Sequence, residues 1–187
     1  MPPRTDSRQR FIDAAADLFH TQGYHATGLN QLVSAGGAPK GSLYFHFPGG
    51  KEQLAAEALA RSSEQLRDLL ADALAAGDTD AVVEALAENL RASDFQRGCP
   101  LATVALDASS ASEPIRQACA EGFESWRLAI AEFVRRKGIE AARADALSVL
   151  ALSMIEGALL LARTQRDLTP LRVVAEHLRT TLESEQP

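Results

Sequence analysis

The stretch GGAPKGSLYFHFPGGKEQL, residues 36–54, decides how the beginning of this chain folds. Glycines and prolines stand on both sides of its centre, so the stretch cannot be one long helix, because these residues interrupt or end helices. Pro39 suits the first turn of a helix, where its missing N–H costs nothing. The residues between the breaks therefore predict a short helix that combines basic, small and aromatic side chains.

The residues before this stretch predict two more helices. Apolar residues at helical spacing indicate a first helix over roughly residues 6–22, which ends at Gly23. Thr27 is placed to cap a short second helix that ends at Gly36. Two short helices joined by a tight glycine turn are the parts of a helix-turn-helix, whose second helix enters the major groove of DNA.

The residue types of the third helix suit contact with DNA. Gly41 lets the backbone approach closely, while Lys40 and Ser42 can donate to base edges or phosphates. Leu43 and Phe47, four positions apart, share a face that can anchor this helix to the first one. The candidate DNA-binding residues are Thr27, Gly28, Lys40, Gly41, Ser42, Tyr44, Phe45, His46 and Lys51.

The rest of the chain also predicts helices and no strand, so we expect an all-α fold of about nine helices. The six further helices are expected over residues 51–76, 79–93, 101–109, 113–137, 141–164 and 169–184. The composition changes near residue 50, which predicts a domain of residues 1–50 followed by a larger helical domain of residues 51–187.

Composition narrows the class of protein. The net charge of -6 argues against a protein that coats nucleic acid along its whole surface. Residues 1–51 nevertheless carry more basic than acidic side chains, which indicates a polyanion-binding part on an acidic body. The two cysteines form no disulfide framework, and we expect Cys99 and Cys119 to be small buried hydrophobic residues. Without a signal pattern or a long apolar run, the sequence predicts a cytoplasmic protein with no membrane partner.

The tract ATGLNQLVSAGGAPKGSLYFHFPGGKEQL, residues 26–54, resembles the DNA-binding domain of TetR family transcriptional regulators. The family pattern places a threonine before the second helix, a lysine-glycine-serine-leucine-tyrosine run, a histidine-phenylalanine pair and then lysine-glutamate. Gly36 departs from it, since the family usually has alanine there, and FPGGKE is one residue longer than the common form. With GCPLATVALD, FESWRLAIAEFV and SMIEGALLLAR downstream, the chain is similar to the drug- and flavonoid-responsive subgroup of the lincomycin-resistance repressor type.

This resemblance implies a homodimeric repressor that binds a palindromic double-stranded DNA operator and is released by a small apolar or aromatic effector. The domain of residues 51–187 would then bind the effector and form the dimer. The helix over residues 141–164 supports a dimer independently, because it is apolar nearly all round and so must be buried on more than one side. The alternative is a monomer with this helix at its centre.

Two sets of side chains are candidates for these roles. For the dimer interface they are Leu152, Ile155, Leu159, Leu171, Val174 and Leu178. For an effector pocket they are Phe95, Leu101, Val104, Phe123, Trp126 and Met154, since apolar ligand sites are lined by hydrophobic and aromatic residues. Ordinary core packing is the alternative role of each pocket candidate.

Other functional classes find less support. The sequence contains no nucleophile elbow, phosphate-binding loop, zinc-ligand spacing or pair of Glu-x-x-His units, so we expect no enzyme, catalytic residue, metal or cofactor. A helical protein-interaction module that has lost operator binding remains the alternative. Salt dependence distinguishes the two, because DNA binding weakens steeply as salt rises.

Overall fold

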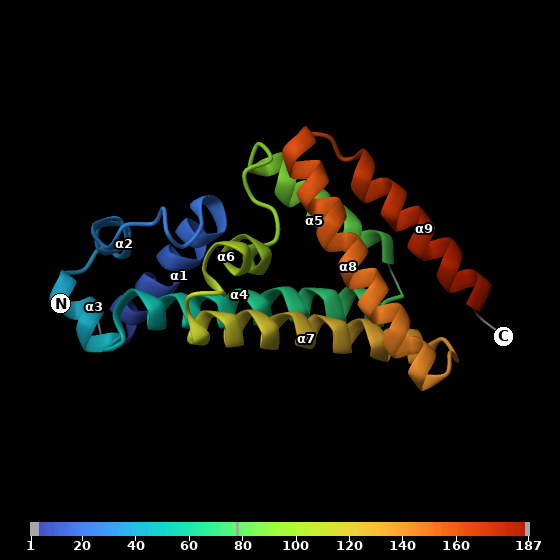
Figure 1. Ribbon diagram of the computed structural model, residues 1–187, viewed down its shortest axis with the longest axis horizontal. Helices are drawn as coiled ribbons and strands as arrows, with labels where there is room; N and C mark the ends of the chain where they lie inside the picture. Colours follow the sequence, from blue (N-terminus) through green and yellow to red (C-terminus); the bar gives the residue numbers. More distant parts are fainter. Residues whose placement is uncertain (1–3, 78, 186–187) are drawn as a thin grey trace. The chain divides into compact units, whose positions relative to one another are not determined.

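The computed structural model describes residues 4–77 and 79–185, with side chains from residue 7 onward (Figure 1). These residues form nine α-helices and no strand, which confirms the all-α prediction. The helices are α1 (Arg4–Gln22), α2 (Leu29–Gly36), α3 (Lys40–His46), α4 (Gly50–Ala75), α5 (Thr79–Ala92), α6 (Pro100–Ala108), α7 (Glu113–Arg136), α8 (Ala141–Gln165) and α9 (Thr169–Glu185). Helical spacing and the glycine and proline breaks therefore located the helices to within about two residues.

The chain divides into two compact units, each built from two segments. Unit 1 comprises Met1–Glu64 and Pro100–Gly122, and unit 2 comprises Gln65–Cys99 and Phe123–Pro187. The predicted division at residue 50 follows the chain order, whereas α6 and the first turns of α7 pack with the N-terminal helices. Sequence order alone does not reveal such packing, because it depends on which apolar faces meet.

Unit 1 has a core of large apolar side chains beneath the short helices. Helix α1 packs against α2, α3 and α6. The rings of Phe11 and Phe47 meet edge to face, with centroids 6.4 Å apart. Leu43 and Phe47 are completely buried, which confirms that they anchor α3 to α1. Burying a side chain of this size stabilises a fold by roughly 1.5–3 kcal/mol.

The start of α2 differs from the prediction. Gly28, with φ -80° and ψ 149°, is the N-cap residue, and its N–H donates to the Gln31 side chain at 3.4 Å. Thr27 lies one position earlier and is completely buried. Its hydroxyl donates to the Gly23 carbonyl at 2.7 Å, so Thr27 closes the turn between α1 and α2 instead of capping α2.

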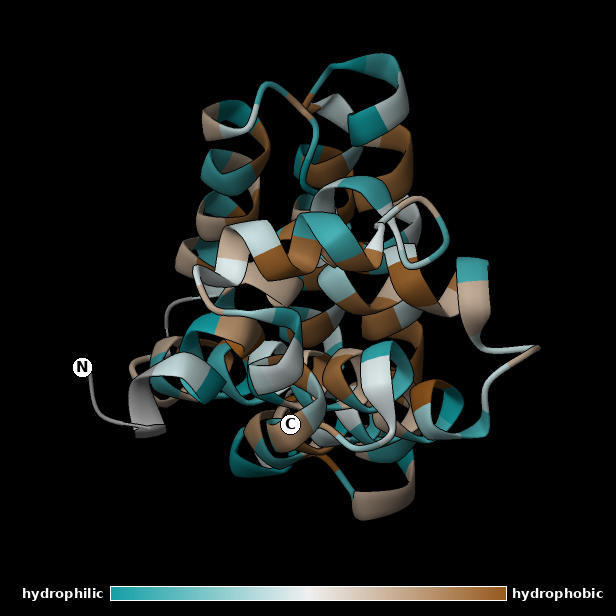
Figure 2. Cartoon of the chain, turned by 90° about the vertical axis from the view of Figure 1, so that its left-hand side faces the viewer, coloured by the Kyte–Doolittle hydropathy of each residue, from teal (hydrophilic) through white to brown (hydrophobic). Residues whose placement is uncertain are grey.

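Unit 2 is held by amphipathic helices around a second core. Figure 2 shows hydrophobic and hydrophilic residues in succession along single helices. Helix α9 packs against both α8 and α5. The core residues are Leu74, Ile130, Phe133, Val134, Ile139, Ala144 and Leu147. Mixed faces of this kind bury one side of a helix and leave the other side for water or a partner.

Helix α8 departs from this pattern. By length and composition it is apolar enough to cross a membrane. Only 28% of its most apolar 18-residue stretch is buried inside the protein. Val149, Leu150, Leu160 and Leu161 are each about half exposed. A soluble protein rarely leaves so large an apolar face in water, so this face indicates a contact surface.

Candidate nucleic-acid interface and cavity

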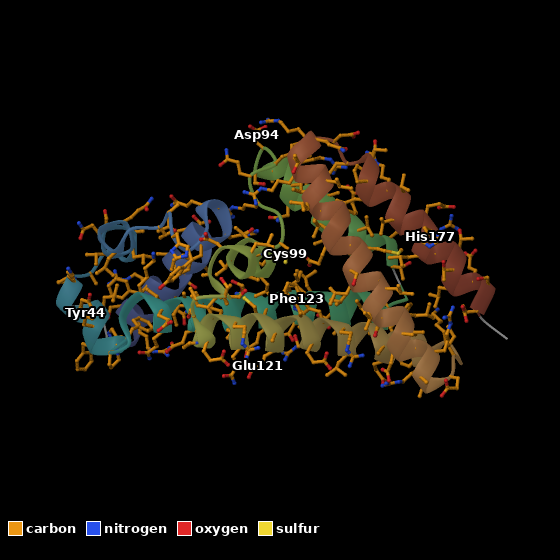
Figure 3. The ribbon with its side chains drawn as sticks, viewed as in Figure 1. Tyr44, Asp94, Cys99, Glu121, Phe123 and His177 are labelled. Atoms are coloured by element: carbon orange, nitrogen blue, oxygen red, sulfur yellow. The ribbon has the colours of Figure 1, made fainter. Side chains whose placement is uncertain are left out.

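Helix α3 presents its polar and aromatic side chains outward. Lys40 and Gly41 are exposed, and Tyr44 and Phe45 keep 45% and 66% of their surface in contact with solvent. Figure 3 shows Tyr44 at the end of unit 1 that α3 forms. Ser42 is half-buried on the same short helix. Because the buried anchors lie on the opposite face, the packing of α3 leaves Lys40, Tyr44 and Phe45 exposed to solvent.

His46 and Lys51 lie less openly. His46 is half-buried, and its Nε2 lies 2.9 Å from the Ser7 hydroxyl of α1. The Lys51 amine donates to the Tyr24 carbonyl at 2.6 Å and lies 4.1 Å from the centre of the Tyr24 ring. Burial lowers the pKa of Lys51, and the negative charge of Asp107 partly offsets this effect. The contacts of the Lys51 amine in this structure are therefore with the protein itself.

The nine predicted DNA contacts thus divide into three groups. Gly28, Lys40, Gly41, Tyr44 and Phe45 are exposed, while Ser42, His46 and Lys51 are half-buried. Thr27 is completely buried beneath the turn that it closes. Its burial follows from tertiary packing of the α1–α2 turn, which the local sequence does not show.

A cavity of about 110 Å³ lies inside unit 2. Apolar residues of α4, α5, α7, α8 and α9 form most of its wall, including Leu74, Ile130 and Ile155. Its polar lining residues are Thr79, Asp80, Arg179 and Thr181. A more polar hollow of about 290 Å³ shares Thr79, Asp80 and Arg179 with it. An apolar chamber with a few polar groups is typical of small-molecule sites.

The six predicted pocket residues do not line this cavity. Leu101 and Val104 are buried in unit 1. Phe95, Phe123, Trp126 and Met154 belong to unit 2, where the rings of Phe123 and Trp126 meet edge to face at 5.5 Å. The prediction rested on side-chain size, whereas the cavity lies among ordinary aliphatic residues that no sequence signal distinguishes from core.

Of the six predicted interface residues, two are buried within the chain and four are half-buried. Leu159 and Leu171 are buried, and Ile155 and Leu178 line the cavity. Leu152 packs against the core of unit 2, and Val174 is half-buried. The prediction recognised that α8 is apolar all round, but helical spacing alone did not show which side faces inward.

Burial raises the pKa of two acidic groups, Cys119 and Glu156. Burial raises the pKa of the Cys119 thiol to about 11, so this cysteine stays protonated. Cys99 is buried as well, which confirms the prediction for both residues. Burial also raises the pKa of the Glu156 carboxyl, and a hydrogen bond with Cys99 partly opposes this. Among residues 7–77 and 79–185 no group of three or more histidine, cysteine or acidic side chains could hold a metal ion.

The fold and the exposed α3 define a helix-turn-helix protein with a separate helical body. Comparisons with known proteins agree. Residues 11–58 match the model of bacterial regulatory proteins of the tetR family, and residues 75–177 match that of the LmrA/YxaF-like C-terminal domain of transcriptional regulators.

The chain is similar to two regulators of Bacillus subtilis (strain 168). It is 41% identical to the HTH-type transcriptional regulator LmrA over 171 residues, which cover 89% of this chain and 91% of LmrA. It is 39% identical to the HTH-type transcriptional regulator YxaF, with 95% of this chain and 96% of YxaF covered.

Solved structures show the same fold. A TetR regulator from Chloroflexus aurantiacus superposes with a TM-score of 0.78 at 29% identity and covers 99% of this chain and 98% of its own. SCO4454 from Streptomyces coelicolor reaches a TM-score of 0.83 at 19% identity, covering 100% of this chain and 92% of its own.

The chain belongs to the TetR family and carries an LmrA/YxaF-like C-terminal domain. It is a DNA-binding transcriptional regulator, as the resemblance of residues 26–54 predicted. The comparisons point to a family of transcriptional regulators, and one long apolar helix such as α8 is weak evidence for a membrane span.

Proposed function

We propose that the protein is a cytoplasmic, ligand-released repressor that binds a near-palindromic operator as a homodimer. The observation that carries this proposal is the outward face of α3, which is polar and aromatic above two completely buried anchors. Such a helix can enter the major groove without disturbing its own support. Its exposed residues are Lys40, Gly41, Tyr44 and Phe45.

Each exposed group of α3 has a separate part in this proposal. Lys40, in the first turn, can donate to guanine O6 and N7. Gly41 has no atom within 4 Å of the position of an added Cβ, so it leaves room for the duplex. The Tyr44 hydroxyl can donate to a phosphate, and the Phe45 ring can contact a thymine methyl group. Gly28 and Ser42 lie at the edge of this surface, and Thr27 falls outside it.

The dimer interface in this proposal is the exposed apolar face of α8 together with Val173 of α9. Exposed positions of α8 recur at helical spacing and include two small residues, Ser153 and Gly157. Small residues let two helices approach closely, and the flanking leucines supply apolar area. A two-fold dimer presents two copies of α3 to two half-sites, which accounts for a palindromic operator.

The effector site in this proposal is the cavity of unit 2. Its apolar wall suits a small hydrophobic or aromatic molecule, and Thr181 and Arg179 offer polar contacts at its edge. Release from DNA then requires that the effector bind the DNA-free state more tightly than the DNA-bound state. Without such differential affinity, a ligand shifts no equilibrium however tightly it binds.

The test is selection of duplexes from a random DNA pool, followed by measurement of the affinity for the selected duplex against salt. We expect a two-fold symmetric sequence whose affinity falls steeply with salt, because phosphate contacts release counterions. Absence of enrichment, with or without a library of small aromatic compounds, would favour a protein-interaction module over the regulator proposed here. An asymmetric selected site would contradict the dimeric arrangement.

A further inference from the structure

A residue far from the helix-turn-helix in sequence holds the turn that leads into it. Asp107, near the end of α6, accepts a hydrogen bond from the His25 backbone N–H at 2.7 Å. Its Oδ2 would lie 3.1 Å from a Cβ built on Gly23, which has φ +82°. The carboxylate therefore sits directly against the Gly23–His25 turn between α1 and α2, and a hydrogen bond to a charged acceptor is stronger than one between neutral groups.

Lys51 holds the same turn from another element. Its amine donates to the Tyr24 carbonyl and lies over the Tyr24 ring, a contact that combines a hydrogen bond with a cation–π interaction. Asp107 contributes an attractive Coulomb interaction with this amine. The Lys51 amine thus holds Tyr24, the middle residue of the turn, and the Asp107 carboxylate holds His25, its last residue.

A further hydrogen bond joins the segment after α6 to the start of α4. The Ser112 hydroxyl, between α6 and α7, donates to Oε1 of Glu52 in the first turn of α4 at 2.5 Å. Ser112 is buried and also accepts from the Ile115 N–H at 3.3 Å. The segment around the end of α6 is therefore attached to both the α1–α2 turn and the start of α4, which lie before and after α2 and α3 in the chain.

We propose that Asp107 is a positioning residue of the DNA-binding part of the protein. It holds the Gly23–His25 turn, and through it α2 and α3, in the arrangement that reads DNA, although Asp107 itself touches no DNA. Thr27 transmits this hold, since its buried hydroxyl donates back to the Gly23 carbonyl immediately before α2. Asp107 lies outside residues 11–58, so the DNA-binding domain defined by the family is completed here by a residue of α6.

A pair of substitutions with equal charge change separates this role from simple electrostatics. Both Asp107→Ala and Asp107→Asn remove one negative charge, which by itself favours binding to a polyanion. Asparagine can still accept the His25 N–H, whereas alanine cannot. We expect Asp107→Ala to weaken binding to the selected duplex about tenfold, the effect of losing one hydrogen bond to a charged group, and Asp107→Asn to stay within about threefold of the wild type.

One control variant and one further test variant accompany the affinity measurement. Glu64→Gln removes an exposed negative charge of unit 1 far along α4 and is expected to change affinity less than about twofold. Lys51→Met is expected to weaken binding without changing the slope of affinity against salt, because the slope counts phosphate contacts. A shallower slope for Lys51→Met would assign its amine to a phosphate and overturn the part given to Lys51.

Hydrogen exchange of the His25 amide in the DNA-free protein tests the hold directly. We expect slow exchange in the wild type and in Asp107→Asn, and fast exchange in Asp107→Ala. Equal or higher DNA affinity in Asp107→Ala, or fast exchange already in the wild type, would overturn the proposal. The exchange measurement needs no DNA, so its failure is distinguishable from absence of operator binding. Slow exchange at the amides in the middle of α1 in the same sample shows that each variant is folded.

Discussion

Gly36 and Gly41 stand five positions apart in the helix-turn-helix, and their surroundings are opposite. Gly36 is buried, and a Cβ there would overlap the ring of Phe11, so α2 packs against α1 at a distance that only glycine permits. Helices α1 and α2 therefore approach more closely here than an alanine would allow. Gly41 is exposed and has open space around it. Gly36 thus permits close packing in the core, and Gly41 leaves open space at the surface.

Gly41→Leu is expected to abolish operator binding while leaving the fold intact. No protein atom lies within 4 Å of the new Cβ at this exposed position, and leucine favours a helix over glycine by about 0.5–1 kcal/mol. It would, however, stand between α3 and the floor of the major groove. Affinity for the selected duplex and the thermal midpoint measure the two effects, and undiminished affinity would mean that the backbone of α3 does not approach the DNA at this point.

At the scale of single elements, α8 carries the clearest conflict between sequence and environment. Its inward residues pack in unit 2, yet Val149, Leu150, Leu160 and Leu161 remain about half exposed. Helix-forming residues and apolar spacing explain why α8 forms. They do not explain an apolar face in water, which a second copy of the chain would cover.

Gly157→Leu is expected to weaken the dimer at least tenfold without lowering the stability of the monomer. No protein atom lies within 4 Å of the Cβ position, so the chain itself tolerates the larger residue. A partner helix packed against this small residue does not, because overpacking costs about 1–3 kcal/mol at each site and a two-fold dimer carries the substitution twice. Sedimentation equilibrium measures the dissociation constant.

Gly41→Leu serves as the matched control, since it makes the same change at an exposed helical glycine of α3. We expect this variant to retain the dimer of the wild type. If Gly157→Leu also retains it, the face of α8 around Gly157 is not the interface.

At the scale of the whole molecule, the proposed regulation requires that the cavity of unit 2 and the DNA-binding helices influence each other. The cavity lies in unit 2 and α3 lies in unit 1, while α4 and α7 each contribute residues to both units. Coupling between two binding sites is reciprocal, so a ligand that weakens DNA binding by some factor is itself weakened by DNA by the same factor.

Benzene, a single-ring apolar probe, is expected to bind the cavity of the wild-type protein, because the cavity is apolar and its volume of about 110 Å³ is of the same order as the roughly 150 Å³ of a cavity that binds benzene. Ala151→Leu places additional atoms into the cavity wall and is expected to abolish this binding. Ala85→Leu, at an exposed position of α5, is the control and should bind as the wild type does. Methyl chemical shifts report the binding, and an unaffected Ala151→Leu would place the probe elsewhere.

Predictions from the sequence succeeded where short-range rules act. The nine helices, the anchoring of α3 by Leu43 and Phe47, and the burial of both cysteines follow from spacing, helix-breaking residues and side-chain chemistry. The predicted role of Thr27 as a helix cap was wrong, and the cavity of unit 2 lies among residues other than those predicted to form a pocket. A threonine before a helix is equally suited to cap it or to close the preceding turn, and packing decided for the turn.

The sequence by itself determined an all-helical regulator of the TetR family with a short aromatic helix between two glycine-rich breaks. Those properties reside in contiguous residues, because helix periodicity and the motif of residues 26–54 are local. Tertiary structure alone decided that Asp107 meets the turn at His25, that Lys51 points inward, and which aliphatic residues leave a cavity. Each of these depends on how faces of distant segments pack together. Helical spacing shows which residues share a face, but it does not show which segment packs against that face.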